Sequence, residues 1–596
     1  MKACRQRNSL HNSECALVTR NNSARKHASV KKRNSRRNVV LGLLALCLLG
    51  MVFSIAGCRK SSTQSGGNSV DVPKDALEVD FLYSSEKENW IRAVTGPFNG
   101  AGHKTASGRR IFIKATPMGS GELMDAVLSG QQHAHLLSPA SAAFIKQANA
   151  QSRAKTGKDL LAKTDNLVLS PVVIAMWKPM AQALGWGKKP IGWGDVLALA
   201  RDRKGWAAYG FPQWGQFKFG HTNPEYSNSG LISVLAEVYA AAGKKAGLTQ
   251  DDLAKPAIGQ YVSDIESSVV HYGTSTGFFA TKMFDNGPQY LSAAVLYESS
   301  VIDSYSQDKM AFPVVAIYPK EGTFWSDHPA GIVEREWVTP EHREAAAMYI
   351  QYLLDKAQQQ KAIDWGFRPG SPDVPLGAPI DTAHGVDPME PKTTLELPSA
   401  DLIDGVLKLW DKKKKPADVV LVLDTSGSMN DDNKLINARL GTKQLISMMS
   451  DSDIFSLLPF NSERSWAATD LPLRTGRNQA NQMVDSLFAH GGTALYDAIQ
   501  DAYQHLAQSP DKNGKIVAVV VLTDGEDNES KTRLDDLLSQ VHFDGESHTT
   551  RVFTIAYGSD ARKDVLKQIA EATEAKSYTG MPQNIVDVFK DISTFF

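Results

Sequence analysis

The sequence contains only four cysteines among 596 residues, and all four lie at its beginning, at positions 4, 15, 47 and 58. Residues 59–596 must therefore fold without a disulfide bond or a thiolate metal site. This absence does not argue against secretion, because a large domain with an ample core has no need of disulfides. The chain also lacks the H-E-x-x-H motif and the Walker phosphate loop, so it carries neither of these enzyme signatures.

The chain also has no excess of positive or negative charge, because 65 lysines and arginines balance 65 acidic residues. The balance is uneven, because residues 1–57 hold eleven basic residues against the single acid Glu14. The remainder carries about ten net negative charges, which argues against nucleic-acid binding by the folded part. A chain of this length is too long for one core, and we expect two to four domains.

Residues 1–57 have the organisation of a secretion signal. Clustered lysines and arginines precede Val39 to Gly57, nineteen residues without a charge, and small residues follow at the end. Ile55-Ala56-Gly57-Cys58 resembles a bacterial lipobox, which implies cleavage before Cys58 and lipidation of that residue. The alternative is an uncleaved membrane helix, because nineteen apolar residues can just span a bilayer. Both alternatives place the body on the extracytoplasmic face of the cell membrane, with 58–75 as a flexible tether.

Residues 76–395 repeat one local pattern, in which a short apolar strand leads into a hydroxyl-bearing loop and then a helix. The loops are Ser84-Ser85, Gly119-Ser120-Gly121 and Ser138-Pro139. This alternation is typical of an α/β fold with a parallel sheet. Because a helix amino end exposes free N–H groups, serines there can cradle a polar ligand. Each serine alone is equally well explained as an ordinary helix cap.

Later segments of the same region add to this pattern. A Ser/Gly/Asn-rich stretch around Ser227 precedes a long helix, Ala293 to Tyr297 ends in Glu298, and a helical stretch leads to 365–369. In this order the segments resemble bacterial periplasmic-type solute-binding proteins, especially the oxyanion-binding branch. The resemblance implies two α/β lobes joined by crossing strands, with a small solute between them. Position by position, it implies that the cleft contains Ser84 or Ser85, Ser120, Ser138, Ser227 and Glu298.

One motif in this region also fits an enzyme. Gly273-Thr274-Ser275-Thr276-Gly277 matches the G-x-S-x-G elbow of α/β-hydrolases, which would make Ser275 a nucleophile. Asp303 and His328 are then the available acid and base. The same hydroxyls are also explained as a helix amino end that faces a ligand, so the hydrolase stays an alternative hypothesis.

After a predicted linker at 396–416, which includes a short amphipathic helix, residues 417–596 alternate between strand and helix. We expect strands near 417–423, 453–459, 464–469, 516–522 and 551–557. Two apolar runs end in Asp424-Thr425-Ser426-Gly427-Ser428 and Thr523-Asp524-Gly525, and Gly491-Gly492-Thr493 precedes a helix. Buried apolar runs of this kind indicate a doubly wound parallel sheet, whose ligands gather at its carboxyl edge. Carboxylate and hydroxyl oxygens suit a hard divalent cation.

The three segments DTSGSM, GGTAL and LTDGED, in this order, resemble the metal-ion-dependent adhesion site of von Willebrand factor A (VWA) domains. The resemblance implies bound Mg²⁺ (or Mn²⁺ or Ca²⁺) and completion of its shell by an Asp or Glu of a protein partner. The implied ligands are Asp424, Ser426, Ser428, Thr493 and Asp524. The alternative is a set of sheet-end loops whose Ser and Asp only cap the chain.

These observations together predict a binding protein and not an enzyme, because no general base, nucleophile or phosphate loop accompanies the five ligands. We expect a two-lobed solute-binding domain followed by a doubly wound VWA domain, anchored at the extracytoplasmic face of the membrane. The first would capture a small solute and the second would bind a protein through the metal. The alternative is a substrate-binding lipoprotein that delivers solute to an ABC transport system.

Overall fold

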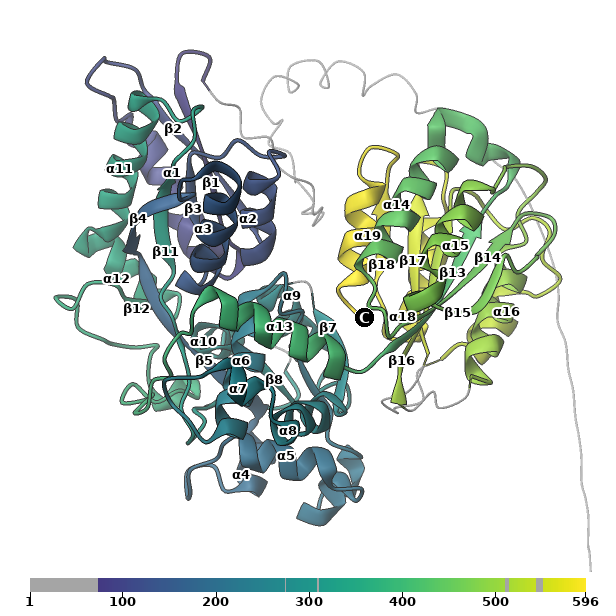
Figure 1. The fold of residues 1–596 in the computed structure, drawn as a ribbon, viewed down its shortest axis with the longest axis horizontal. Helices are drawn as coiled ribbons and strands as arrows, with labels where there is room; N and C mark the ends of the chain where they lie inside the picture. Colours follow the sequence, from purple (N-terminus) through teal and green to yellow (C-terminus); the bar gives the residue numbers. More distant parts are fainter. Residues whose placement is uncertain (1–72, 274, 308–309, 510–513, 543–549) are drawn as a thin grey trace, which may run out of the picture. The chain divides into compact units, whose positions relative to one another are not determined.

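The computed structural model describes residues 73–596 except 274, 308–309, 510–513 and 543–549. The predicted signal sequence, the lipidation site Cys58 and nearly all of the predicted tether lie outside the described residues. Within the described ranges, no helix is both long enough and apolar enough to cross a bilayer. The same ranges form three sheets, each covered by helices (Figure 1).

The first sheet has the strand order β2-β1-β3-β11-β4. Strands β1 to β3 are parallel to one another, while β11 pairs antiparallel with both β3 and β4. Its strands are β1 (Leu77–Ser84), β2 (Ile111–Met118), β3 (Leu136–Ser138), β4 (Leu161–Asn166) and β11 (Pro329–Val333). The associated helices are α1 (Glu88–Ala101), α2 (Ser120–Leu128), α3 (Ala142–Thr156), α11 (Pro340–Leu354) and α12 (Lys356–Asp364), with a 3₁₀ turn at Ser85–Lys87.

The helix α1 shows why this lobe closes around one core. Its apolar residues Trp90, Ile91, Val94 and Phe98 recur at helical spacing and are all buried. They share a core with alternate residues of β1 and with Tyr349 of α11. The ring of Phe98 meets that of Tyr349 edge to face at 4.9 Å, an arrangement that aromatic pairs favour.

The second sheet has the order β10-β5-β8-β6-β7, and β9 and β12 also pair with β5. Its strands are β5 (Val168–Trp177), β6 (Phe219–Thr222), β7 (Val269–Gly273), β8 (Ala293–Tyr297), β9 (Val314–Ile317), β10 (Trp325–Ser326) and β12 (Arg368–Pro369). Its helices are α4 (Lys178–Leu184), α5 (Trp193–Arg201), α6 (Asn228–Ala242), α7 (Gln250–Leu253), α8 (Pro256–Glu266), α9 (Thr276–Asn286) and α10 (Glu298–Ser304). Three 3₁₀ turns complete the region at Gly205–Tyr209, Pro212–Trp214 and Thr382–His384.

Three segments cross between these sheets. One residue, Leu167, separates β4 of the first sheet from β5 of the second, the chain returns through β10 and β11, and it crosses again from α12 to β12. The first two crossings are joined where the Leu167 N–H donates to the His328 carbonyl at 3.2 Å. The prediction of two α/β lobes joined by crossing strands is confirmed.

The segment predicted as a linker at 396–416 contains α13 (Ala400–Lys413). This helix packs against α3, α6, α7 and α8. Its apolar face buries Ile403, Val406 and Trp410, and the Trp410 ring meets that of Tyr272 edge to face at 5.3 Å. Residues 400–413 are therefore an integral helix of the solute-binding region.

The third sheet has the order β15-β14-β13-β16-β17-β18, with β13 at its centre and parallel to both neighbours. Its strands are β13 (Ala417–Asp424), β14 (Ile454–Phe460), β15 (Ala468–Pro472), β16 (Ile516–Thr523), β17 (Arg551–Tyr557) and β18 (Ser577–Gly580). The helices are α14 (Lys434–Met448), α15 (Leu473–Asp485), α16 (Leu495–Ala507), α17 (Leu534–Gln540), α18 (Lys563–Ala572) and α19 (Ile585–Ser593), preceded by a 3₁₀ segment at Gly427–Asn433.

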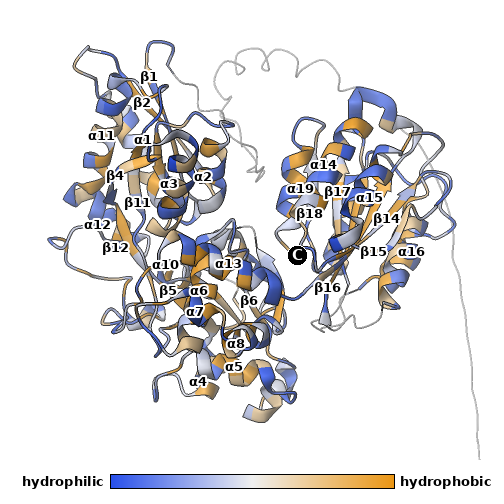
Figure 2. Cartoon of the chain, viewed as in Figure 1, coloured by the Kyte–Doolittle hydropathy of each residue, from blue (hydrophilic) through white to orange (hydrophobic). Residues whose placement is uncertain are grey.

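Helices cover both faces of this sheet because β13 is apolar on both sides. Val419 and Leu421 lie in the same core as Phe589 of α19, whereas Val420 and Val422 pack with Ile499 of α16. Figure 2 shows hydrophobic strands between helices whose outer faces are hydrophilic. This packing confirms the predicted doubly wound sheet, to which the structure adds β18, a four-residue edge strand without an apolar run.

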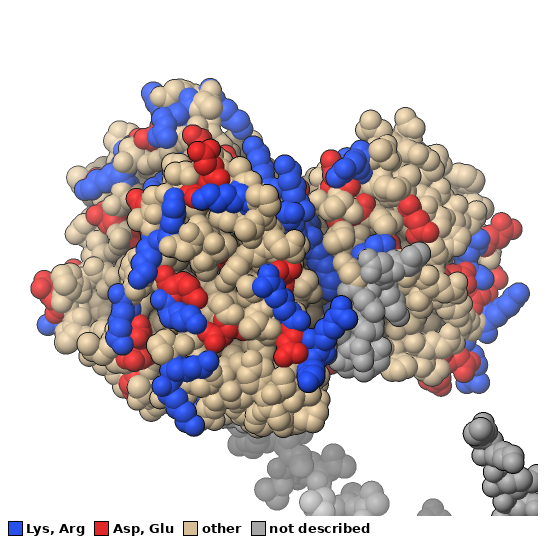
Figure 3. Space-filling view, turned by 60° about the horizontal axis from the view of Figure 1, so that its bottom comes forward, with Lys and Arg blue, Asp and Glu red and all other residues tan. Residues whose placement is uncertain are grey.

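Charges of both signs are distributed over the described surface. Figure 3 shows lysines and arginines together with aspartates and glutamates on the face in view. Exposed pairs such as Lys320–Asp195 at 2.9 Å and Arg343–Glu334 at 2.7 Å neutralise one another locally. Pairs this exposed contribute little to stability.

Candidate functional site

The three loops predicted to bind a metal meet at the carboxyl edge of the third sheet. β13 ends at Asp424 and its neighbour β16 ends at Thr523, so the loops that follow both strands start side by side. The Gly427 N–H donates to the Gly491 carbonyl at 3.0 Å, and the Asn528 N–H donates to the Thr493 carbonyl at 3.0 Å. The backbone thus holds the second loop against the first and the third.

Four of the five predicted ligands are linked through hydrogen bonds. The Ser426 and Ser428 hydroxyl oxygens lie 3.1 Å apart, and the Ser428 hydroxyl donates to Asp524 Oδ1 at 2.8 Å. Asp424 accepts the Ser426 N–H at 2.7 Å and the hydroxyl of Thr523 at 2.5 Å. Asp424 is fully buried, and this burial raises its pKa to about 6.

The fifth predicted ligand, Thr493, lies beside this group. It is buried, and its N–H donates to the Asn528 side-chain oxygen at 2.8 Å. Its hydroxyl oxygen is 3.6 Å from the position that a Cβ atom on Gly525 would take, next to Asp524. This distance places the Thr493 hydroxyl next to the loop that carries Asp524.

A lysine that the sequence analysis did not predict also belongs to this site. Lys434, the first residue of α14, places its ammonium 2.7 Å from Asp524 Oδ2, and both side chains are almost completely buried. With Asp424 and Asp524 ionised, the group carries one net negative charge. A lysine at a helix start is ordinarily solvated, so only the three-dimensional arrangement reveals this contact.

A groove of about 350 Å³ opens next to the loops that carry the predicted metal ligands. Its lining includes Thr425, Asn461 and His490 from the loops and the exposed Phe488, which is 69% accessible. The Phe488 ring stacks on His490 with centroids 4.8 Å apart. The exposed ring is available for contact with another molecule, and aromatic side chains are enriched where proteins bind one another.

In the solute-binding region, two predicted cleft serines converge on a buried lysine. The Lys87 ammonium is completely buried, contacts the Ser84 hydroxyl and donates to the Ser138 carbonyl at 3.0 Å. His328 Nδ1 lies 3.2 Å from the ammonium and 3.3 Å from Glu86 Oε1. Burial lowers the pKa of Lys87 to about 8. The hydroxyl of Ser138 has no hydrogen-bond partner among the described residues.

The other predicted cleft serines belong to opposite lobes. Ser120 is buried at the start of α2 and accepts the Ala140 N–H at 3.0 Å. Ser227 is buried before α6, with its hydroxyl 3.5 Å from that of Thr276. Ser85 lines a cavity of about 240 Å³ with Asn89 and, from the second lobe, residues such as Gly277 and Ser299. These three serines thus lie at or near the meeting of the lobes.

Glu298 has a different role from the one that the sequence predicted. Its carboxylate receives two hydrogen bonds from Arg368, at 2.8 and 2.7 Å, and also contacts the Tyr318 hydroxyl. Both members of the ion pair are buried. The carboxylate is therefore satisfied within the protein, by a partner 70 residues away that no local pattern in the sequence reveals.

The hydrolase alternative gains no geometric support. Ser275 precedes α9, while Thr274 lies outside the described residues. His328, the candidate base, is fully buried, and its Nδ1 faces Lys87 and Glu86. Burial, with the Lys87 charge adding to it, lowers the pKa of His328 to about 4. No contact with Ser275 accompanies these interactions in the described part of the chain.

The lobes touch directly at the start of α2, where the Gly121 N–H donates to the Tyr226 carbonyl at 3.0 Å. A Cβ atom at Gly121 would lie 2.3 Å from the Glu225 carbonyl oxygen. We therefore expect Gly121→Ala to separate the lobes here and to speed amide hydrogen exchange of residues 119–128 by about tenfold. Gly96→Ala in α1, where a Cβ meets nothing within 4 Å, is the matched control. Unchanged exchange in Gly121→Ala would contradict this expectation.

Comparisons with known proteins find two domain families in the chain. Residues 85–368 match the bacterial extracellular solute-binding protein family, and residues 418–588 match the von Willebrand factor type A domain. A curated protein named "Uncharacterized protein YfbK", from Escherichia coli (strain K12), is 27% identical over 168 residues. That match spans 28% of this chain and 28% of the relative.

Solved structures resemble each part separately. A periplasmic thiamin binding protein shows 12% identity and a TM-score of 0.42, covering 57% of this chain and 98% of its own. A von Willebrand factor type A structure from Catenulispora acidiphila shows 21% identity and a TM-score of 0.26, covering 30% of this chain and 42% of its own.

The family matches together define a protein built from two domains. The first is an extracellular solute-binding domain, and the second is a VWA domain.

Proposed function

We propose that this chain is a membrane-anchored extracytoplasmic binding protein. Its solute-binding domain captures a small molecule, and its VWA domain binds a protein partner through Mg²⁺. The single observation that carries the second part is the convergence of Asp424, Ser426, Ser428 and Asp524 at the carboxyl edge of one sheet. The anchor rests on the basic and apolar leader with Cys58 as the lipidated residue.

The donor set fits Mg²⁺. Two carboxylates and the Ser426, Ser428 and Thr493 hydroxyls supply only oxygen ligands, and a magnesium site uses few carboxylates. With Lys434 neutralising one aspartate, the bound ion would leave the group with one net positive charge. Such a site attracts an acidic side chain from outside, through a charge-assisted contact. The groove with Phe488 offers that partner an apolar contact beside the metal.

Removing the lysine tests the charge balance at the metal. We expect Lys434→Met to tighten Mg²⁺ binding by about tenfold at low salt, because a positive charge next to Asp524 opposes the cation. Isothermal titration calorimetry measures this change. Lys443→Met on the same helix, where the lysine pairs with the exposed Asp485, is the control and should not alter the affinity. Weaker binding in Lys434→Met would contradict the proposed charge balance.

A second candidate function is solute delivery to an ABC permease. The observation that favours it is the direct contact between lobes at Gly121 and Tyr226, since lobe closure is what a delivery protein undergoes around its solute. Stimulation of a reconstituted permease's ATPase by the solute-loaded chain would support this role. Stimulation that persists in Asp424→Ala would assign transport to the first domain alone.

A further inference from the structure

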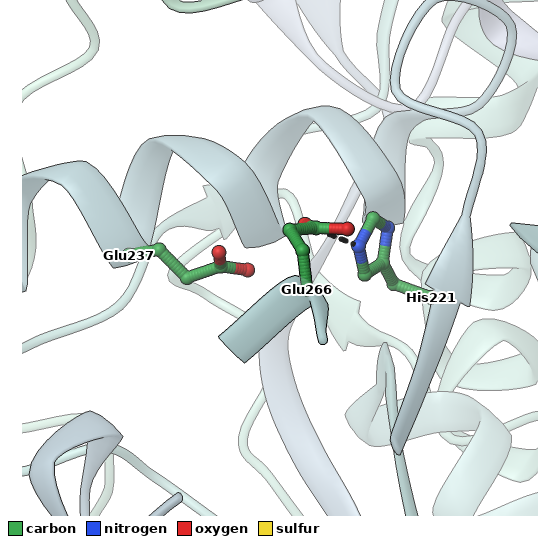
Figure 4. Close-up of side chains that lie close together, drawn as sticks. All are labelled: His221, Glu237 and Glu266. Atoms are coloured by element: carbon green, nitrogen blue, oxygen red, sulfur yellow. Dashed lines mark hydrogen bonds and ion pairs between the residues drawn. The ribbon is translucent and has the colours of Figure 1, made fainter. Parts of the chain in front are cut away.

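Three buried ionisable residues meet inside the second lobe. His221 lies on β6, Glu237 on α6, and Glu266 is the last residue of α8. All three have zero exposure, and their ligand atoms lie within 4.8 Å of one another. Figure 4 shows the two carboxylates and the imidazole turned toward one another from separate elements. The cluster uses none of the residues assigned to the solute cleft or the VWA site.

The hydrogen bonds around His221 leave one ring nitrogen facing a carboxylate oxygen. Its Nδ1 lies 2.8 Å from the Thr222 carbonyl oxygen, which can only accept, so Nδ1 carries the proton. The other ring nitrogen, Nε2, lies 3.0 Å from Glu266 Oε1. The second oxygen of Glu266 accepts the Tyr272 hydroxyl at 2.7 Å. Because Nδ1 holds one proton, Nε2 can meet this carboxylate oxygen favourably only with a second proton or with a metal ion that both atoms bind.

Glu237 adds an oxygen without a partner. Its Oε1 accepts the Ser233 hydroxyl at 2.9 Å, while its buried Oε2 has no hydrogen-bond partner among the described residues. Two glutamates that share one dry pocket repel each other when ionised, so the pocket favours a cation that both can bind.

We propose that His221 Nε2, Glu237 and Glu266 bind a structural Zn²⁺ ion within the second lobe. An imidazole with two carboxylates is a ligand set that zinc accepts, and structural zinc is held away from solvent. The hydrogen bond from His221 Nδ1 to a backbone carbonyl is the support that zinc-binding histidines ordinarily have. Zinc bonds of about 2.0 Å at tetrahedral angles place ligand atoms about 3.3 Å apart, close to the 3.0 Å between Nε2 and Oε1.

Such an ion would join three elements of the lobe. β6 leads into the loop that carries Ser227, and α6 begins directly after that serine. The ion would thus stabilise the strand and helix that carry the second lobe's predicted cleft residue. Metal bound in a site without exposure exchanges slowly, so it would be acquired during folding.

The test measures zinc in the full-length chain, purified without a histidine tag and dialysed against EDTA. The chain carries Asp424→Ala, which removes the exchangeable VWA ion. We expect about one zinc per chain by inductively coupled plasma mass spectrometry, and less than a tenth of that in Glu237→Gln, which preserves side-chain volume. Glu298→Gln is the control, because it alters an equally buried glutamate of the same lobe outside the cluster. It should retain its zinc even though its stability falls.

A second measurement distinguishes a zinc ion bound by the three side chains from protons shared among them. If the cluster binds zinc, Glu237→Gln should melt at a lower temperature. The same substitution should also abolish the visible absorption of Co²⁺ that replaces zinc in the cluster. If only protons occupy the pocket, Glu237→Gln melts at the same or a higher temperature, because an amide replaces a protonated carboxyl. That result, or a chain folded in zinc-containing medium that holds less than a tenth of an equivalent, would overturn the proposal.

Discussion

Asp424→Ala should abolish metal-dependent binding of a protein partner while the solute-binding domain still captures its ligand. Asp424 lies at the end of the central strand β13 and connects two loops, through the Ser426 N–H and the Thr523 hydroxyl. Its loss removes a carboxylate ligand and the bond that orients a serine ligand. We expect Mg²⁺ affinity to fall by at least about 100-fold, which calorimetry measures directly, with EDTA-sensitive partner binding lost in parallel.

Two further variants separate metal loss from misfolding. Asp424→Asn keeps the side-chain volume but removes the charge, and it should lose metal in the same way. Asp418→Asn alters a buried aspartate at the opposite end of the same strand, where it accepts the Ser509 hydroxyl at 2.8 Å. This control should retain full Mg²⁺ binding. Partner binding that survives both Asp424 substitutions and EDTA would rule out the adhesion function.

Glu298→Gln should cause the largest loss of stability, about 3–5 kcal/mol for the solute-binding domain. The substitution leaves the Arg368 guanidinium buried without its carboxylate, and a buried unpaired charge is costly. Two carbonyls, of Asp387 and Pro388, and the Trp325 ring still contact Arg368 and compensate only in part. Denaturant unfolding of the full-length chain, monitored at the tryptophans, measures the difference.

The double variant Glu298→Gln/Arg368→Met shows whether the charge is the cause. Removing both members of the pair leaves no uncompensated ion, so we expect it to recover most of the lost stability. A double variant as unstable as Glu298→Gln would instead assign the loss to the Tyr318 contact or to packing. A Glu298→Gln protein as stable as the unaltered chain would show that the pair is not needed.

The folds of both domains were predictable because their strands are short apolar runs in an alternating order. Val419 to Leu423 is apolar at every position, and the structure buries it on both faces between helices. The metal-type loops were predictable for a related reason, since parallel neighbouring strands bring their carboxyl ends together. Together with the resemblance to VWA metal sites, this predicted that Ser428 and Asp524 come together, and their side-chain oxygens lie 2.8 Å apart although 96 positions separate the residues.

Pairings between distant charged residues were not predictable. Lys434 beside Asp524, Arg368 beside Glu298 and Lys87 beside His328 each join residues 70 or more positions apart. Nothing in the local pattern distinguishes such a lysine or arginine from one in solvent. The cluster of His221, Glu237 and Glu266 was not predictable either, because these residues follow no short metal-ligand motif.

The helix α13 determines where the chain can be divided into separately folding pieces. A fragment that stops near residue 395 would expose the hydrophobic groove that Ile403, Val406 and Trp410 fill. It would then be prone to aggregate, for a reason that has nothing to do with its ability to hold a solute. A cut after Lys413 keeps this cover in place and leaves β13, from Ala417, intact for the other piece.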